Sequence, residues 1–281
     1  MKPIIITIIA SILTLLTSVF LYELVVRFLI KKKKPSKKTK ILTIGLVWIT
    51  LFIVGAPVFF ANYMHCQEAA LAALNSDDNV TVSEINKAYL FDGYGTEDVL
   101  VFYPGARVDE KAYAPLCHEL AENGIDCILV KMPFHMAFTD SKAYLRYTSQ
   151  YDYKNLYLGG HSLGGAIAAL FAAKYVDEPD SPTGLVLLAA YPSAPLPDIK
   201  TCIIYGEKDT VMNMDKYNIG KEYWSNSTEE YIISGGNHAG FGDYGSQKGD
   251  SPASISAEEQ LDETVNIITD FILDTSVSDP E

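Results

Sequence analysis

The stretch that most constrains this chain is residues 155–165, which read Asn-Leu-Tyr-Leu-Gly-Gly-His-Ser-Leu-Gly-Gly. A G-x-S-x-G motif, Gly160 to Gly164, lies between a short apolar run that favours a strand and an alanine-rich run that favours a helix. In such a tight turn, the residues two places before and after the serine would collide unless both were glycine. The new helix presents free N–H groups and its positive dipole end beside Ser162. The stretch therefore predicts a nucleophile elbow, with Ser162 as the catalytic serine.

Charge is divided unevenly along the 281 residues, whose net charge is -13. Residues 1–61 contain one acidic residue, so 62–281 contain 13 basic and 34 acidic residues, a net charge of about -21. A domain this acidic is not expected to bind nucleic acid, which requires a basic surface. It should also repel anionic substrates unless its site is locally positive.

Two apolar segments near the beginning predict a membrane anchor within residues 1–64. Residues 4–24 are almost wholly apolar and residues 41–63 contain no charge, and each is long enough to cross a bilayer. Residues 31–40 between them contain seven lysines, which the positive-inside rule places in the cytoplasm. We therefore expect a two-helix transmembrane hairpin in the cell membrane, with the rest of the chain outside the cytoplasm. A cleaved signal peptide is the competing interpretation of the first segment.

The remainder divides into a juxtamembrane helix and linker at 65–79, a folded domain at 80–275 and a short tail at 276–281. Within the domain, strands and helices alternate, which is typical of a parallel sheet covered on both faces. The expected strands are 80–85, 88–91, 99–103, 127–131, 156–158, 185–189, 202–205 and 230–233. The expected helices are 113–123, 144–150, 166–175 and 258–273.

A serine nucleophile needs a base and an acid that orients the base. In enzymes with such an elbow, the chain order is serine, acid, histidine. The one histidine after Ser162 is His238, in a glycine-rich loop that follows the last expected strand. Asp209 follows the penultimate strand, where the acid belongs, and Glu207 is its nearest rival. Weaker candidates, which follow the elbow helix instead of a strand, are Asp177 and Asp180.

The oxyanion needs two N–H donors. The first is expected from Leu163, the residue after the nucleophile, and the second from the loop after the strand 99–103. In that loop we favour Ala106, with Arg107 second.

A large lid is not expected, because only about a dozen residues separate the strands 185–189 and 202–205. The site should be open and walled by residues such as Phe134, His135 and Tyr191. Five scattered histidines give no metal-ligand spacing, so neither a metal nor another cofactor is implied.

These residues resemble the α/β-hydrolase superfamily, and more narrowly the membrane-anchored or secreted bacterial hydrolases related to dienelactone hydrolases. The resemblance covers about residues 80–273 and rests on the segments 103–106, 160–165, 206–209 and 236–245. It implies an α/β-hydrolase fold with a mostly parallel eight-stranded sheet, helices on both faces, and a triad of Ser162, Asp209 and His238. Dienelactone hydrolases use a cysteine nucleophile, so the serine here does not imply that substrate.

The sequence therefore predicts a serine hydrolase that cleaves an ester, or alternatively a thioester or amide, of a small-molecule or lipid-like acyl substrate. Two alternatives remain open. The same triad would serve an acyltransferase with a lipid or cell-wall acceptor, and a catalytically silent hydrolase fold would serve as a binding module. The oligomeric state is not indicated.

Overall fold

The computed structural model describes residues 36–95, 97–148, 151, 153–175 and 180–273, together with residues 16, 17, 19, 20 and 23. The chain forms two compact units, Met1–Asn62 and Tyr63–Glu281. Each is described by itself below.

The first unit contains helix α2 (Lys37–Ala61), which covers most of the second predicted apolar segment. The helix begins inside the predicted basic loop 31–40, so residues 37–40 are helical instead of looped. Lys40 Nζ donates to Glu23 Oε1 at 2.7 Å. Among the described residues, no helix combines the length and apolar character needed to cross a membrane. Most of residues 4–24, like the tail 276–281, lies outside the described residues, and the membrane hairpin stays a prediction.

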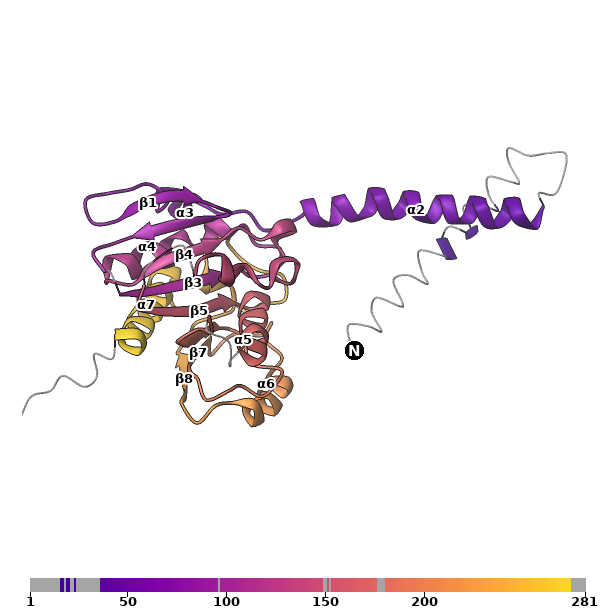
Figure 1. Ribbon diagram of the computed structural model, residues 1–281. Coiled ribbons are helices and arrows are strands. Elements are labelled where there is room, and N and C mark those ends of the chain that lie inside the picture. The colour runs from indigo at the N-terminus through magenta and orange to yellow at the C-terminus, as the bar shows by residue number, and fades with distance from the viewer. Residues whose placement is uncertain are drawn as a thin grey trace, which may run out of the picture. The chain divides into compact units, whose positions relative to one another are not determined.

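The second unit is built on an eight-stranded sheet with the order β1-β2-β4-β3-β5-β6-β7-β8 (Figure 1). The pairs β1–β2 and β2–β4 are antiparallel and the remaining pairs are parallel. The strands are β1 (Thr81–Ile85), β2 (Ala88–Asp92), β3 (Asp98–Tyr103), β4 (Asp126–Val130), β5 (Asn155–His161), β6 (Gly184–Leu188), β7 (Lys200–Gly206) and β8 (Thr228–Ile233). The eight expected strands and the mostly parallel sheet are thus confirmed.

Two hydrophobic layers form on the two faces of the sheet, because successive side chains of a strand point to opposite faces. Leu100 and Phe102 of β3 pack in the layer that contains α4 (Ala114–Glu122) and α7 (Ala257–Leu273). Val99 and Val101 pack in the layer that contains α5 (Leu163–Tyr175) and α6 (Met214–Gly220). A short helix, α3 (Glu68–Ala72), precedes the sheet in the chain. The strands of the sheet centre are buried on both faces, which is typical of parallel sheets.

Two local expectations were inaccurate. The helix expected at 144–150 is a short 3₁₀ turn, η4 (Ala143–Arg146). Its Tyr144 N–H donates to the Tyr103 hydroxyl at 2.8 Å instead of continuing a helix. Helix α6 was not expected, although Asn213 caps it by accepting the Lys216 N–H at 2.9 Å. No helix lies between β6 and β7.

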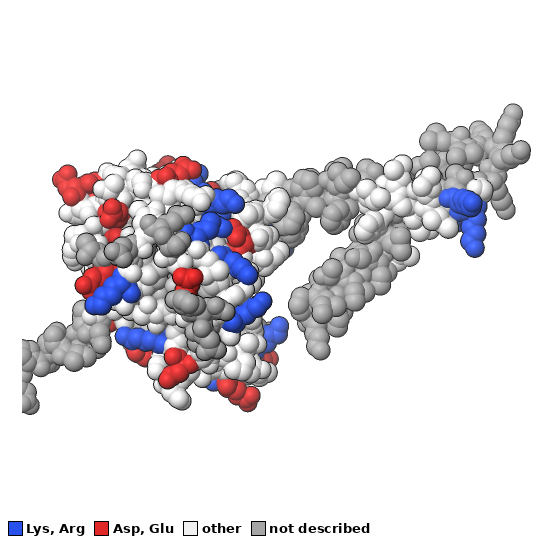
Figure 2. All heavy atoms as spheres, viewed as in Figure 1, with Lys and Arg blue, Asp and Glu red and all other residues white. Residues whose placement is uncertain are grey.

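Charged side chains are not spread evenly over the second unit (Figure 2). On the face shown, most Lys and Arg lie in the right half of the folded domain. Asp and Glu occur on both sides of this face.

Helix α7 should contribute strongly to stability through Ile268, which is fully buried against the sheet layer. Replacing Ile268 by Ala deletes buried carbon atoms and leaves a cavity, so the free energy of unfolding should fall by about 2–5 kcal/mol. Urea denaturation of the full-length chain measures this. The matched control is Ile219→Ala, because Ile219 is 58% exposed and its loss should change stability by less than about 0.5 kcal/mol.

Candidate active site

The predicted elbow is present between β5 and α5. Ser162 has a φ of 52°, in the left-handed region that costs energy for a residue with a side chain. A Cβ on Gly160 would lie 2.6 Å from the Tyr103 carbonyl oxygen, and a Cβ on Gly164 would lie 2.1 Å from the same atom. Both positions therefore require glycine, as the sequence indicated. The Ser162 N–H donates to Leu188 O at 2.8 Å, which fixes the turn against β6.

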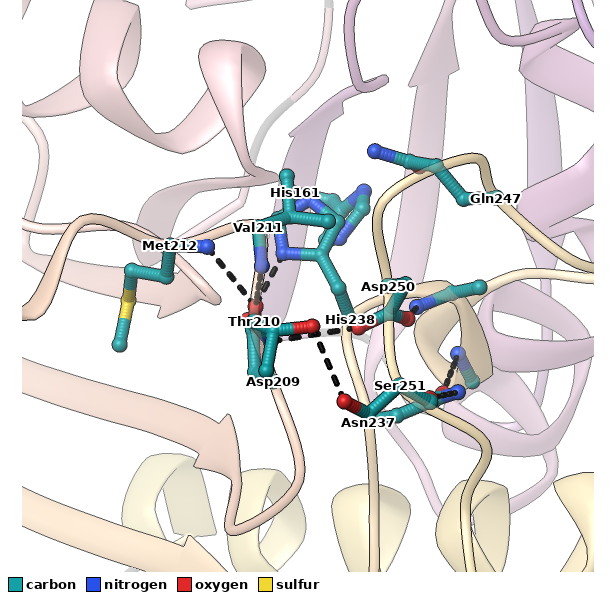
Figure 3. A network of polar contacts seen from close by, with 12 residues as sticks. His161, Asp209, Thr210, Val211, Met212, Asn237, His238, Gln247, Asp250 and Ser251 are labelled. Carbon is teal, nitrogen blue, oxygen red and sulfur yellow. Dashed lines mark hydrogen bonds and ion pairs between the residues drawn. The ribbon is translucent and has the colours of Figure 1, made fainter.

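The predicted acid and base meet in a buried pair. His238 Nδ1 lies 2.7 Å from Asp209 Oδ2, and the two side chains are only 2% and 1% exposed. The other carboxylate oxygen of Asp209 accepts the N–H groups of Val211 and Met212, each at 2.8 Å (Figure 3). Because a carboxylate only accepts, the pair requires Nδ1 of His238 to carry the proton. The arrangement leaves Nε2 as the nitrogen available to accept a proton.

The base lies next to the elbow. The ring of His238 packs on the ring of His161, the residue before Ser162, with 4.6 Å between centroids. Nε2 of His238 is buried and has no hydrogen-bond partner among the described residues. An unpartnered buried nitrogen of this kind is costly, and a serine hydroxyl or a substrate group would satisfy it. The Ser162–His238 bond itself is not formed, and such catalytic bonds often tighten only when substrate is bound.

The rival acids are placed differently. Glu207 is exposed, and its carboxylate accepts the Gly235 N–H at 3.0 Å, which lowers its pKa. Asp180 is exposed beyond α5, and Asp177 lies outside the described residues. Of the candidates, only Asp209 contacts His238 among the described residues.

The three candidate oxyanion donors differ in whether their backbone N–H groups already donate a hydrogen bond. Leu163 is the first residue of α5, so its N–H has no acceptor within the helix. Ala106 donates no hydrogen bond to another described residue, whereas the Arg107 N–H is already bound to His135 O at 2.8 Å. The geometry therefore favours Leu163 and Ala106 over Arg107.

A buried network beside the elbow was not recognised in the sequence. The Tyr113 hydroxyl lies 2.8 Å from His161 Nδ1 and accepts the Gly105 N–H at 3.1 Å. It thereby connects the elbow to the loop that contains Ala106. Burial and the neighbouring His238 lower the pKa of His161 well below its usual range, so His161 is neutral. The neutral His161 packs beside the turn, between Tyr113 and His238.

Asp250, in the loop at 241–256, contacts both the segment after Asp209 and the segment after His238 (Figure 3). One carboxylate oxygen of Asp250 accepts the Thr210 N–H at 3.3 Å and the other accepts the Ala239 N–H at 2.9 Å. Thr210 follows the acid and Ala239 follows the base. Asp250 therefore holds together the two loops on which the Asp209–His238 pair depends.

The expected wall residues occupy loops at the same edge of the sheet. Phe134 is 60% exposed, and His135 stacks on Tyr63 with 3.9 Å between ring centroids. Tyr191 packs edge-on against Tyr217 of α6. None of these contacts involves Ser162, so their role in lining a substrate pocket stays a prediction.

No curated protein matches the chain. A dienelactone hydrolase from Anabaena variabilis superimposes with a TM-score of 0.51 at 13% identity, over 70% of this chain and 98% of that one. MGS-MChE2, an α/β hydrolase from the metagenome of Mar Chica lagoon sediments, gives 0.52 at 16% identity, over 70% and 99%. TT1662 from Thermus thermophilus gives 0.51 at 11% identity, over 69% and 98%. At these identities the likeness shows the fold alone.

The family assignment comes from the sequence comparison. The model of the alpha/beta hydrolase family matches residues 99–262, which is more than half of the chain and includes Ser162, Asp209 and His238. The chain therefore belongs to the alpha/beta hydrolase family and is an enzyme of that type.

Proposed function

We propose that this protein is a serine hydrolase that cleaves a carboxylic ester through an acyl-enzyme. The observation that carries the proposal is the buried Asp209–His238 pair, whose unpartnered Nε2 lies beside the strained elbow. Thioesters and amides share the same chemistry and are the alternative substrates.

The proposed mechanism has two half-reactions, and in each of them His238 first takes a proton and then returns it. Ser162 Oγ attacks the carbonyl carbon while His238 Nε2 takes the hydroxyl proton, and Asp209 stabilises the imidazolium. The N–H groups of Leu163 and Ala106 bind the oxyanion. His238 then returns the proton to the leaving alcohol, which departs as the acyl-enzyme forms. Water repeats the sequence, so the products are the carboxylic acid and free Ser162.

The substrate is proposed as a small or lipid-like acyl compound. The short 189–199 connection between β6 and β7 supports an open site, since it is too short for a lid domain. Transfer of the acyl group to a lipid or cell-wall acceptor instead of water is the second candidate, because the same triad forms the same acyl-enzyme. One structural neighbour is named a dienelactone hydrolase, but at 13% identity this name is no evidence that the present chain acts on a dienelactone.

The first test is labelling of the full-length chain with a fluorophosphonate probe, together with hydrolysis of p-nitrophenyl esters from acetate to octanoate. Wild type should label and turn over, and Ser162→Ala should lose both, because the attacking oxygen is gone. Mass spectrometry of products formed with an added alcohol separates hydrolysis from transfer. If the folded wild-type protein neither reacts with the probe nor hydrolyses any of the esters, the hydrolase proposal is rejected and the binding-module hypothesis is retained.

Asp209→Asn tests the acid. An amide at this position favours the wrong tautomer of His238 and does not stabilise its cation, so kcat should fall by about 10⁴-fold. The control is Glu207→Gln, which changes the rival carboxyl group and should leave kcat near the wild-type value. A larger loss in Glu207→Gln than in Asp209→Asn would reverse the assignment of the acid.

Asp250 should act as a positioning residue. Asp250→Ala releases both the Thr210 and the Ala239 N–H groups, so kcat should fall by about ten- to a hundredfold while KM changes little. Asp250→Asn retains one acceptor oxygen and should recover part of the rate. Asp215→Ala, an exposed aspartate on α6, is the control. Equal rates for Asp250→Ala and wild type would show that the two loops hold their positions without this carboxylate.

A further inference from the structure

A cavity lies apart from the proposed catalytic residues. It has a volume of about 770 Å³ and lies between α3, α4, α7 and the segment 240–243. This volume is within the range of about 300–1,000 Å³ that small-molecule sites occupy. Ser162, Asp209 and His238 do not line it. The cavity therefore needs an explanation other than ester hydrolysis.

The walls of the cavity combine apolar surface with carboxylates. The apolar part consists of small and aliphatic side chains from α3, α4 and α7 together with Phe241. The carboxylates come from four separate segments, and no Lys or Arg is among the lining residues. The acidic lining residues are Asp77, Glu119, Glu122, Asp243 and Glu258.

Three of these carboxylates are already engaged, and one of them, Glu122, accepts a hydrogen bond from the Asn79 side-chain amide at 3.5 Å. Asp77 lies 2.9 Å from His118 Nε2 and also accepts the N–H groups of Asn79 and Val80. Asp243 accepts the Ala70 N–H at 2.7 Å and so holds α3 in place. By contrast, the side chains of Glu119 and Glu258 make no hydrogen bond or ion pair with another described residue. Neither carboxyl group is paired with a described Lys or Arg side chain, although Glu258 lies in the first turn of α7 and His118 is close to Glu119.

The pKa of Glu119 reflects its acidic surroundings. Burial, and the negative charges of Asp262, Glu122 and Glu258, raise its pKa to about 7, although His118 acts in the opposite direction. The other acidic residues that line the cavity are Asp77 and Asp243. Near neutral pH the cavity therefore holds a carboxyl group that loses its proton readily when a cation approaches.

We propose that this cavity binds an organic cation with an apolar body, specifically a primary ammonium or guanidinium group attached to a short hydrocarbon. The ammonium or guanidinium N–H groups would donate charge-assisted hydrogen bonds to the carboxylates of Glu119 and Glu258. The hydrocarbon would cover the alanine-rich wall formed by α3 and α4. A neutral or anionic ligand of the same size lacks the first of these interactions.

A divalent metal ion is the competing occupant. Asp77, His118 and Glu122 place ligand atoms within 4.8 Å of one another. However, His118 Nδ1 lies 2.9 Å from Ala73 O, and its Nε2 faces Asp77. Both ring nitrogens already have an acceptor, so a metal would have to break the His118–Asp77 pair. The organic cation requires no such change.

The test is isothermal titration calorimetry of the full-length chain with n-hexylamine, n-hexanol and hexanoate at pH 8. Hexylammonium should bind about tenfold more tightly than hexanol, because charge-assisted hydrogen bonds are stronger than neutral ones. Hexanoate should not bind. The Ser162→Ala protein should give the same affinity, which separates this site from the active site.

Variants locate the site. Glu119→Gln should weaken hexylammonium binding about fivefold, the loss expected for one partly exposed ion pair. Glu263→Gln is the matched control, since Glu263 lies on α7, is exposed and does not line the cavity. Ala72→Trp fills the cavity from an exposed position of α3 and should abolish binding without unfolding the domain.

The pH dependence has a defined sign. Because the pKa of Glu119 is about 7, the carboxyl group is mostly protonated at pH 6 and mostly ionised at pH 8. Hexylammonium should therefore bind about fivefold more tightly at pH 8 than at pH 6, and Glu119→Gln should remove most of that difference.

Three results would overturn the proposal. Equal affinities for hexylamine and hexanol would mean that the cavity is only an apolar site. Unchanged hexylammonium binding in both Glu119→Gln and Ala72→Trp would place the ligand elsewhere. Stoichiometric binding of Mn²⁺ or Zn²⁺ that His118→Ala abolishes, without binding of hexylammonium, would assign the site to a metal ion.

Discussion

The catalytic geometry depends on how closely the first turn of α5 approaches the end of β3. A Cβ on Gly164 would lie 2.1 Å from the Tyr103 carbonyl oxygen and 2.5 Å from that of Pro104. Only glycine allows this approach, and the approach places the free N–H groups of the helix beside the loop that contains Ala106. The proposed nucleophile and the two proposed oxyanion donors are therefore positioned by one backbone contact. A looser packing would separate them.

Backbone strain is concentrated around the same contact. Apart from Lys87 in the turn between β1 and β2, the described non-glycine residues with positive φ lie at or just beyond the carboxyl ends of β3, β4, β5 and β6. These residues are Arg107, Phe134, His135, Ser162 and Ala189. Such conformations persist only where surrounding structure enforces them, and they gather at functional sites. The Arg107 N–H, for instance, is held by His135 O, which joins two strained loops.

Local signals explain what could be predicted from the sequence. Ser162, Asp209 and His238 each follow a recognisable strand within a distinctive turn, and the alternation of strands and helices indicated the sheet. Tyr113 and Asp250 gave no such signal. Tyr113 meets His161 across 48 residues and Asp250 meets Thr210 across 40, so their roles appear only when the chain is folded.

The contacts of His161 and His238 differ, and this difference decides which of the two can act as the proposed base. His161 and His238 are in ring contact, so two positive charges there would repel each other strongly in a buried site. Burial and the proximity of His238 lower the pKa of His161, and the Tyr113 hydroxyl binds its Nδ1. Asp209 contacts only His238 of the two. In the proposed mechanism the single carboxylate therefore directs the proton from Ser162 to His238, and a neutral His161 places no second positive charge beside the imidazolium that forms.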